Sequence, residues 1–426
     1  MVEVAVLPPR DIALLVIFAL MAGAALIRPW LGVLALAFLS FFHPQGYAQG
    51  PVQGYPLVMT MFLITVGAMA KTVVFEQFRP RLAPLLDWRI VMMFTLFGWF
   101  VITTIYSINH WAAWPYLWEV LKILPAIVLM VMLIDTAGKL RALLFVLAIS
   151  IALVTLKGSY WAILTGFQDR VYGPPHSQFG DNNEFAVAMV MSLPLLFLMF
   201  RESTSGGFKA AMLGLIILTY VAVISTWSRG GLLAIGAVTA LLAVQRGRNL
   251  LLLGGVGLCL VLVLAVLPPD WFSRMSTLLH YQTEGSAQSR LGVWRLGLEF
   301  ASRHPWVGGG FKGWIYATLA TGGSVAWHSV YIQQLTEHGI VGLGWWLSLI
   351  LGTIAVGLLA PFRRESQLIE ATHPVGEYQA AIAIALAGYA IGAGFLSIAY
   401  WELVYWLIAA AAIAAGLARA PTAPTV

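Results

Sequence analysis

Long apolar runs recur along almost the whole chain, and they restrict its fold more than any other feature. Polar segments separate eleven runs, at about residues 57–74, 89–106, 117–134, 141–158, 184–200, 211–226, 231–244, 250–267, 340–360, 380–397 and 401–418. Because a helix needs roughly 20 apolar residues to cross a hydrocarbon core about 30 Å thick, most of the chain can lie in a bilayer. Only 10% of the 426 residues are charged, which excludes a cytosolic enzyme, a secreted disulfide scaffold and a receptor with one anchor. We therefore predict an all-α, polytopic membrane bundle of about twelve transmembrane helices.

Lysine and arginine residues fall in alternate loops, and this pattern predicts the two sides of the membrane. Cytoplasmic loops are enriched in these residues, and the basic residues are Lys71, Arg79, Arg81 and Arg89, Lys139 and Arg141, Arg201 and Lys209, Arg246 and Arg248, and Arg363 and Arg364. The loops between them are predicted to lie outside, at 43–56, 107–116, 159–183, 227–230 and 268–339. Because the basic residues are scattered at the ends of apolar runs, the net charge of +6 does not indicate nucleic-acid binding.

The segment 11–42 leaves two topologies open. Arg28 and Pro29 interrupt it, and its 32 residues, at about 1.5 Å each, are too many for one upright crossing and few for two. Two crossings would place the amino terminus outside. We predict one broken crossing, which gives twelve spans and both termini in the cytoplasm.

The segment 268–339 is the longest stretch predicted outside the membrane, and it divides the chain into three parts. Residues 1–267 form transmembrane helices with short loops, 268–339 form an outer loop that carries catalytic elements, and 340–426 form the last transmembrane helices. Within the loop, SRLGVWRLGLEFASR (289–303) predicts an amphipathic helix at the outer membrane surface.

One charge of the predicted helix at 289–303 is out of place. Its apolar stripe is Leu291, Trp294, Leu298 and Ala301, and its charged face is Arg295, Glu299 and Arg303. At about 100° per residue, Arg290 lies beside the apolar stripe, roughly 140° from Arg295. We expect Arg290 to face the protein or the membrane.

Two outer arginines are candidates for anion binding. Arg229 follows Ser228 in the turn of STWSRGG, where it serves either as an interfacial anchor or as an anion ligand. The two glycines after it would let an anion approach the backbone. Arg290 has the same alternatives, a structural salt bridge or a phosphate contact. A guanidinium group is always charged and binds phosphate through two parallel hydrogen bonds.

A histidine is the candidate base. His328 stands in AWHSVYIQQLTEHG, where the outer loop returns to the membrane, and a neutral imidazole can accept a proton near pH 7. A structural role is the alternative. His338, beside Glu337, is the rival base. Neither histidine belongs to an HExxH pattern or another metal-spaced pair, so no metal site is predicted.

Four segments together carry a family resemblance. HSVYIQQLTEHGIVG (328–342) resembles the motif of bacterial O-antigen ligases: His, then Asn, Ser or Gln, nine free residues, Gly, two free residues, then Gly, Thr or Tyr. The fixed positions are His328, Ser329, Gly339 and Gly342. WSRGG (227–231), SRLGVWRLGLEF (289–300) and HPWVGGGFKGW (304–314) also resemble the O-antigen ligase and polymerase superfamily, in matching order. The resemblance is clearest from Asp181 to Gly342, and the residues before it match in hydropathy alone.

The resemblance implies a membrane glycosyltransferase of the bacterial inner membrane whose active site faces the periplasm. It would transfer a glycan from undecaprenyl pyrophosphate to a hydroxyl of the lipid A core oligosaccharide, which completes lipopolysaccharide. On this interpretation His328 is the general base of a metal-independent, inverting transfer, and no cofactor is expected. Arg229 and Arg290 bind the donor pyrophosphate, with Lys312 and His338 in support.

Rival functions share some of these features. A polymerase would extend a second lipid-linked glycan from the same donor, and a protein O-oligosaccharyltransferase would modify Ser or Thr. A transporter of the lipid-linked glycan is a third alternative, but transporters often contain paired repeats and charges near the bilayer midplane. The chain shows no such repeat, and its conspicuous charges lie at the ends of the predicted spans.

Overall fold

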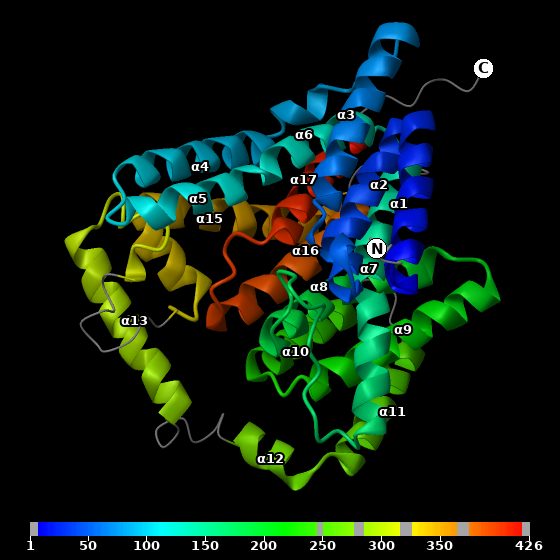
Figure 1. The fold of residues 1–426 in the computed structure, drawn as a ribbon. Coiled ribbons are helices and arrows are strands. Elements are labelled where there is room, and N and C mark those ends of the chain that lie inside the picture. Colours follow the sequence, from blue (N-terminus) through cyan, green and yellow to red (C-terminus); the bar gives the residue numbers. More distant parts are fainter. Residues whose placement is uncertain (1–6, 245–249, 277–284, 316–325, 364–374, 420–426) are drawn as a thin grey trace, which may run out of the picture.

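The computed structural model describes residues 7–244, 250–276, 285–315, 326–363 and 375–419, and these ranges contain helices and no strands (Figure 1). The α-helices are α1 (Pro9–Ile27), α2 (Pro29–Phe41), α3 (Leu57–Phe75), α4 (Trp88–Ile105), α5 (His110–Leu121), α6 (Ile123–Leu133), α7 (Ala137–Leu164), α8 (Asn182–Glu202), α9 (Gly206–Ser225), α10 (Arg229–Val244), α11 (Leu250–Val266), α12 (Pro269–Ser276), α13 (Gly285–Arg303), α15 (Val330–Arg363), α16 (Val375–Gly392) and α17 (Glu402–Ala418). Short 3-10 helices are η1 (Pro44–Tyr47), η2 (Pro51–Gly54), η3 (Ala83–Leu86) and η4 (Ala393–Phe395).

Most of these helices have the length and composition of membrane spans. In the described part of the chain, nine candidate spans are long and apolar enough to cross a bilayer, with α5 and α6 counted together. Three further apolar helices, α2, α10 and α17, are shorter. The prediction of an all-α, polytopic membrane protein is confirmed.

Loop contacts distinguish two ends of the bundle. At one end, which we call the site face, contacts join the predicted outer loops: the Ile108 amide donates to the Gly309 carbonyl, Asn182 to the Thr226 carbonyl, and the His328 amide to Ser397. At the other end, the opposite face, Arg81 donates to the Gly416 carbonyl and Arg141 pairs with Glu202. The predicted alternation of loops therefore agrees with these contacts. Arg246, Arg248 and Arg364 lie outside the described residues.

The first two helices form a hairpin, so the predicted single crossing of 11–42 is wrong. The backbone turns at Arg28, and α2 packs against α1 (Figure 1). At the start of α1, the Asp11 carboxylate accepts hydrogen bonds from the amides of Gln49 at 2.8 Å, Gly50 and Val52. The amino end of α1 therefore lies on the site face, beside the 43–56 loop, and α1 and α2 run in opposite directions between the two faces. The start of α1 and the end of α17 lie on opposite faces rather than on one.

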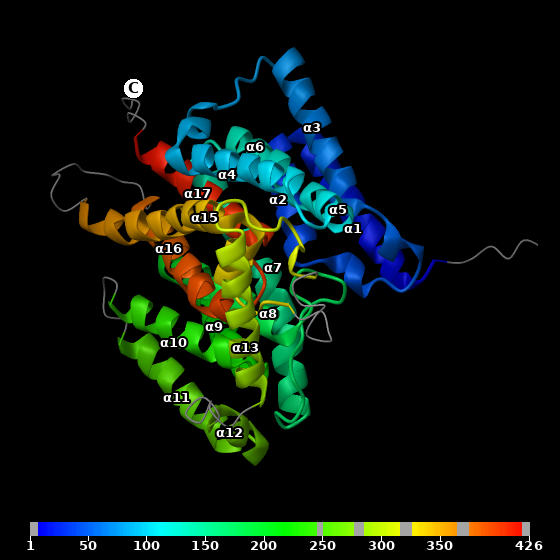
Figure 2. The ribbon, with the colours of Figure 1, turned by 90° about the vertical axis from the view of Figure 1, so that its left-hand side faces the viewer.

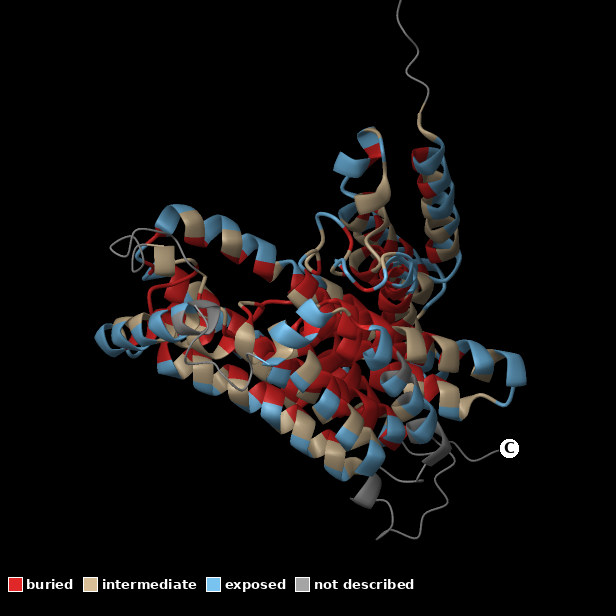
Figure 3. Cartoon of the chain, turned by 90° about the horizontal axis from the view of Figure 1, so that it is seen from below, coloured by how far each residue is buried: buried red, intermediate tan, exposed pale blue. Residues whose placement is uncertain are grey.

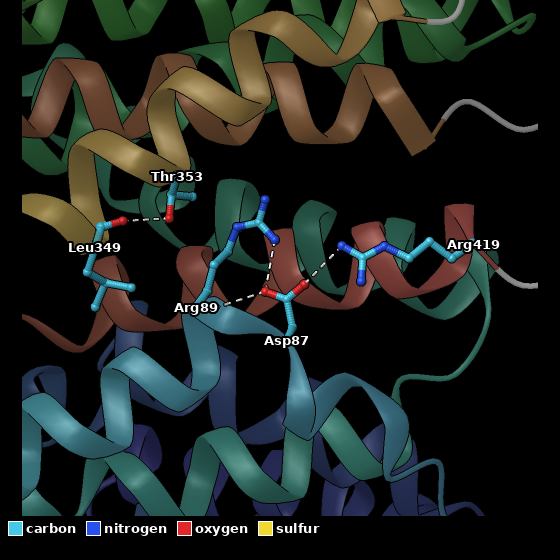
Figure 4. Close-up of polar contacts among 5 residues, drawn as sticks. All are labelled: Asp87, Arg89, Leu349, Thr353 and Arg419. Atoms are coloured by element: carbon cyan, nitrogen blue, oxygen red, sulfur yellow. Dashed lines mark hydrogen bonds and ion pairs between the residues drawn. The ribbon is translucent and has the colours of Figure 1, made fainter. Parts of the chain in front are cut away.

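A buried ion pair lies at the start of α4, on the opposite face, and an exposed arginine after α17 approaches it (Figure 4). Asp87 precedes α4, and its Oδ1 accepts hydrogen bonds from the amide of Arg89 and from Arg89 Nη1, the latter at 2.9 Å. Arg89 is only 1% exposed. Arg419, which follows α17, lies 3.7 Å from Asp87 Oδ2. Because removing one partner of a buried pair leaves an unpaired charge, the Asp87–Arg89 pair stabilises the start of α4. The exposed Arg419 adds a weaker contact from the end of α17.

Helices α8, α16 and α17 form the centre of the bundle. Buried residues make up 78% of the most apolar stretch of α8 and 72% of that of α16, against 17% in α1. Figure 3 shows the same contrast, with buried residues in the middle and exposed residues along the outer helices. In a membrane protein the exposed apolar surface of α1 and α3 is suited to lipid contact.

Helix α13 confirms the helix predicted at 289–303 and corrects its packed side. It lies across the site face and runs across α15 rather than along it (Figure 2). The packed side runs through Arg290, Val293, Trp294, Gly297 and Ala301. Trp294 Nε1 donates to the Trp327 carbonyl at 2.8 Å, and a Cβ at Gly297 would lie 2.5 Å from Ile332. Arg290 thus faces the protein, whereas Leu291 and Leu298, predicted in the packed stripe, are 40% and 53% exposed.

Candidate active site

Three arginines line one small pocket on the site face, which we call the arginine pocket. They are Arg229 at the start of α10, Arg274 in the last turn of α12, and Arg290 on the packed side of α13. The other lining residues are Asn183, Ser228, Gly230, Gly392, Phe395 and Leu396. Its volume of about 20 Å³ admits one small group, so a larger anion would contact the guanidinium groups at the mouth. The structure thus brings together the two arginines predicted from sequence and adds Arg274, which no sequence pattern marks.

The turn between α9 and α10 holds Arg229 in place. Trp227 has a φ of 60°, a region that residues other than glycine seldom adopt. Its carbonyl accepts a hydrogen bond from Arg274 Nε at 3.1 Å. Ser228 Oγ accepts from the amide of Gly231 at 3.1 Å and so caps the first turn of α10. Arg229 therefore stands at a fixed helix start, where the helix dipole adds to its positive charge.

His328 lies just before α15, in a strained backbone conformation. Its φ is 48°, and its amide donates to Ser397 Oγ at 3.0 Å. Burial and the positive charge of Arg290 lower the pKa of the His328 imidazole, and the negative charge of Asp181 opposes that effect. The imidazole is therefore neutral at pH 7 and able to accept a proton. The electrostatic effect of Arg290 also links His328 to the arginine pocket.

His338 and Lys312 lie in a separate polar network. His338 is fully buried, and both ring nitrogens have hydroxyl partners: Thr103 at 2.7 Å and Tyr400 at 2.8 Å. Tyr400 also donates to Glu337. The other oxygen of Glu337 accepts from the Lys312 amide at 3.0 Å. A histidine buried in this way positions its neighbours, whereas His328 is only half-buried and is the better placed of the two to meet a substrate.

A comparison with known families bears on this arrangement. Residues 213–347 match the family model described as O-antigen ligase. This match supports membership in the O-antigen ligase and polymerase superfamily. Members of this family are membrane glycosyltransferase-like enzymes. Residues 9–204 match a second model, described as a family of unknown function (DUF5935). No curated protein matches the chain.

Two glycine-containing segments inside the O-antigen ligase match pack against each other. The Gly309 and Gly310 amides donate to the carbonyls of Thr336 and Glu337, at 2.8 and 2.9 Å. Gly339 has a φ of 68° and kinks α15, and a Cβ there would lie 2.1 Å from the Trp306 carbonyl oxygen. The kink lies next to position 340, where the last transmembrane helices are predicted to start. Helix α15 itself begins earlier, at Val330. Gly339 requires glycine because the two backbones meet closely there.

A second, much larger hollow adjoins the site, and the sequence did not reveal it. We call it the large cavity; it encloses about 770 Å³. Most of its lining comes from residues 36–184, within the match to the family of unknown function, and the rest from 397–406. Lys312 borders it, because Lys312 Nζ lies 4.6 Å from the ring centre of Tyr116, a lining residue. No motif could have marked this cavity, since its residues come from six separate segments.

Proposed function

We propose that the chain is an O-antigen ligase that transfers a glycan from undecaprenyl pyrophosphate to a sugar hydroxyl of the lipid A core oligosaccharide. One observation carries the proposal: Arg229 and Arg290 line the same pocket, and Arg290 acts electrostatically on His328. Displacement of a pyrophosphate needs positive charge at the leaving group and a neutral base at the nucleophile. The site face offers both.

In the proposed step, His328 removes the proton of the acceptor hydroxyl while the hydroxyl oxygen attacks the anomeric carbon of the donor. The bond from that carbon to the pyrophosphate oxygen breaks, and the electron pair stays on the oxygen. Arg229, Arg274 and Arg290 stabilise the charge of the leaving undecaprenyl pyrophosphate, so the step does not depend on a metal ion. A single displacement inverts the anomeric centre.

The proposal places the site face in the periplasm and the bundle in the bacterial inner membrane. Its support is the distribution of charge: Arg81, Arg141 and Lys209 lie toward the opposite face, which suits a cytoplasmic surface.

Reconstitution of the full chain tests the proposed function. The purified protein is placed in proteoliposomes with an undecaprenyl-pyrophosphate-linked glycan and a metal chelator. Rough lipopolysaccharide, a second lipid-linked glycan and a pilin-like protein are offered as separate acceptors. We expect transfer to rough lipopolysaccharide with inversion at the anomeric carbon.

Each other outcome contradicts the ligase proposal in a defined way. Transfer to the second lipid-linked glycan would identify a polymerase, and transfer to the protein would identify an oligosaccharyltransferase. Movement of the donor across the bilayer without any transfer would identify a transporter.

A further inference from the structure

We propose that the large cavity binds the acceptor sugar that carries the attacking hydroxyl, on the other side of a thin wall from the arginine pocket. The inference rests on the proposed function and assigns one substrate to one hollow. Its volume of about 770 Å³ falls within the roughly 300–1,000 Å³ typical of ligand sites.

Two elements separate the hollows, and each contributes neighbouring residues to both. On the segment after η4, Leu396 lines the arginine pocket, whereas Ser397 lines the large cavity. Leu396 is extended, and successive side chains of extended backbone point to opposite sides. At the start of α8, Asn183 lines the arginine pocket and Glu184 the large cavity. A ligand in each hollow would therefore meet the other at this shared wall.

His328 is bound to the wall itself. Its amide donates to Ser397 Oγ, on the cavity side. The two charges that act on its imidazole are Arg290, in the arginine pocket, and Asp181, just before α8. A base at this position can take a proton from a hydroxyl in the large cavity while the pyrophosphate leaves on the arginine side.

The lining of the large cavity suits a sugar better than a pyrophosphate. Aromatic side chains offer flat apolar surface to the C–H faces of a sugar ring, and carboxylates, amides and imidazoles offer partners for its hydroxyl groups. The aromatic residues are Tyr55, Tyr116, Tyr400, Trp401 and Trp406, and the polar residues include His43, Gln45, His176, Gln178, Glu119, Glu184 and Glu402. Lys122, the one lysine among the described residues of this lining, pairs with Glu119 at 2.6 Å, so the lining lacks the clustered positive charge of the arginine pocket.

Gln45 supplies independent evidence of a ligand. Its side chain lines the large cavity and is 9% exposed. Its Nε2 contacts His43 Nδ1 at 3.1 Å, whereas Oε1 has no hydrogen-bond partner among the described residues. A buried amide oxygen without a partner is costly, and a sugar hydroxyl would satisfy it.

Steady-state kinetics of the reconstituted full chain test the inference, with the lipid-linked glycan as donor and rough lipopolysaccharide as acceptor. Gln45→Ala removes the amide oxygen that has no partner in the described part of the chain, and Glu184→Gln replaces a carboxyl group by an amide of the same shape. We expect each variant to raise the acceptor KM about tenfold, as loss of one hydrogen bond does, while the donor KM stays within about twofold. Gln53→Ala in η2 and Glu76→Gln after α3 are matched exposed controls and should behave as wild type.

The contrary results are distinct. A rise in the donor KM alone would assign the large cavity to the donor glycan, and unchanged values for both substrates would remove it from substrate binding. Either result overturns the inference while wild-type transfer upholds the proposed function. Absence of transfer by the wild type would contradict the proposed function and this inference with it. If Gln45→Ala folds poorly, the kinetics of the shape-conserving Glu184→Gln variant decide between these outcomes.

Discussion

The arginine pocket and the large cavity share a wall but differ in size, charge and origin. The small pocket gathers three positive charges, all from residues 213–347. The large cavity combines aromatic rings with carboxylates, mostly from residues 36–184. The two hollows thus come from two regions of the chain that match different family models. The part that matches the O-antigen ligase model carries the arginines that we propose stabilise the leaving group, and the amino-terminal part lines most of the large cavity beside them.

The largest loss of activity should come from replacing His328, whose amide is hydrogen-bonded to Ser397 on the wall between the two hollows. We expect His328→Ala to lower kcat roughly 10²–10⁴-fold, because the acceptor hydroxyl loses its base. Binding of the lipid-linked donor, measured by titration of the purified variant, should persist.

Two other histidines serve as controls for this prediction. His110→Ala, at an exposed position on the site face, should leave turnover unchanged. His338→Ala should lower the thermal midpoint more than kcat, because it breaks hydrogen bonds in the buried network. Near-normal turnover of His328→Ala would show that the base lies elsewhere.

Replacing an arginine of the arginine pocket should mainly weaken the use of the donor. Arg229→Ala and Arg290→Ala are each expected to lower kcat/KM for the donor roughly 10²–10³-fold, through lost stabilisation of the leaving pyrophosphate. Lysine should rescue in part, because it lacks the planar fork of arginine. Arg303→Ala, an exposed position on the same helix as Arg290, is the matched control. If these variants instead raise only the acceptor KM, the arginine pocket binds the acceptor and not the donor pyrophosphate.

The smallest effect is a shift in the pH profile. Turnover should fall at acid pH as the imidazole of His328 becomes protonated, and because its pKa is lowered, the fall should begin below pH 6.5. Arg290→Gln removes a positive charge and should move this acid limb to higher pH. Asp181→Asn removes a negative charge and should move it to lower pH, each by up to about one unit. The residual activity of the two purified variants, measured against pH, checks both shifts. If the acid limbs of both variants match that of the wild type, neither Arg290 nor Asp181 influences the group that titrates.

Local periodicity explains which parts of the site could be predicted. Arg290 does not lie on the charged face of its own helix. The side to which it points can therefore be predicted from helical periodicity over two turns. Arg229 stands in a turn bounded by two apolar runs, so its place at a helix start follows as well. Arg274 lies in a short helix without either signal, so only the folded structure reveals it, through its place in the arginine pocket and its contact with Trp227.

Long-range contacts explain what the sequence could not disclose. Hydropathy marks the break at Arg28 but not the direction in which the chain leaves it, which depends on Asp11 meeting amides about forty residues later. The large cavity depends on loops around His43 and His176 that approach each other only in the folded chain. Leu291 and Leu298 are apolar but exposed. Both belong to the apolar stripe predicted from sequence, and hydropathy does not distinguish a surface that faces lipid from one that faces protein.

The Asp11 hairpin has a practical consequence for handling the protein. Since it sends the amino end of α1 to the site face, which we propose faces the periplasm, a fusion partner attached there would share the compartment of the substrates and would itself have to be exported. A partner attached after α17 would stay with the Asp87 and Arg419 charges, on the other side of the bilayer. A reporter enzyme that is active only outside the cytoplasm should therefore work at the first position and fail at the second.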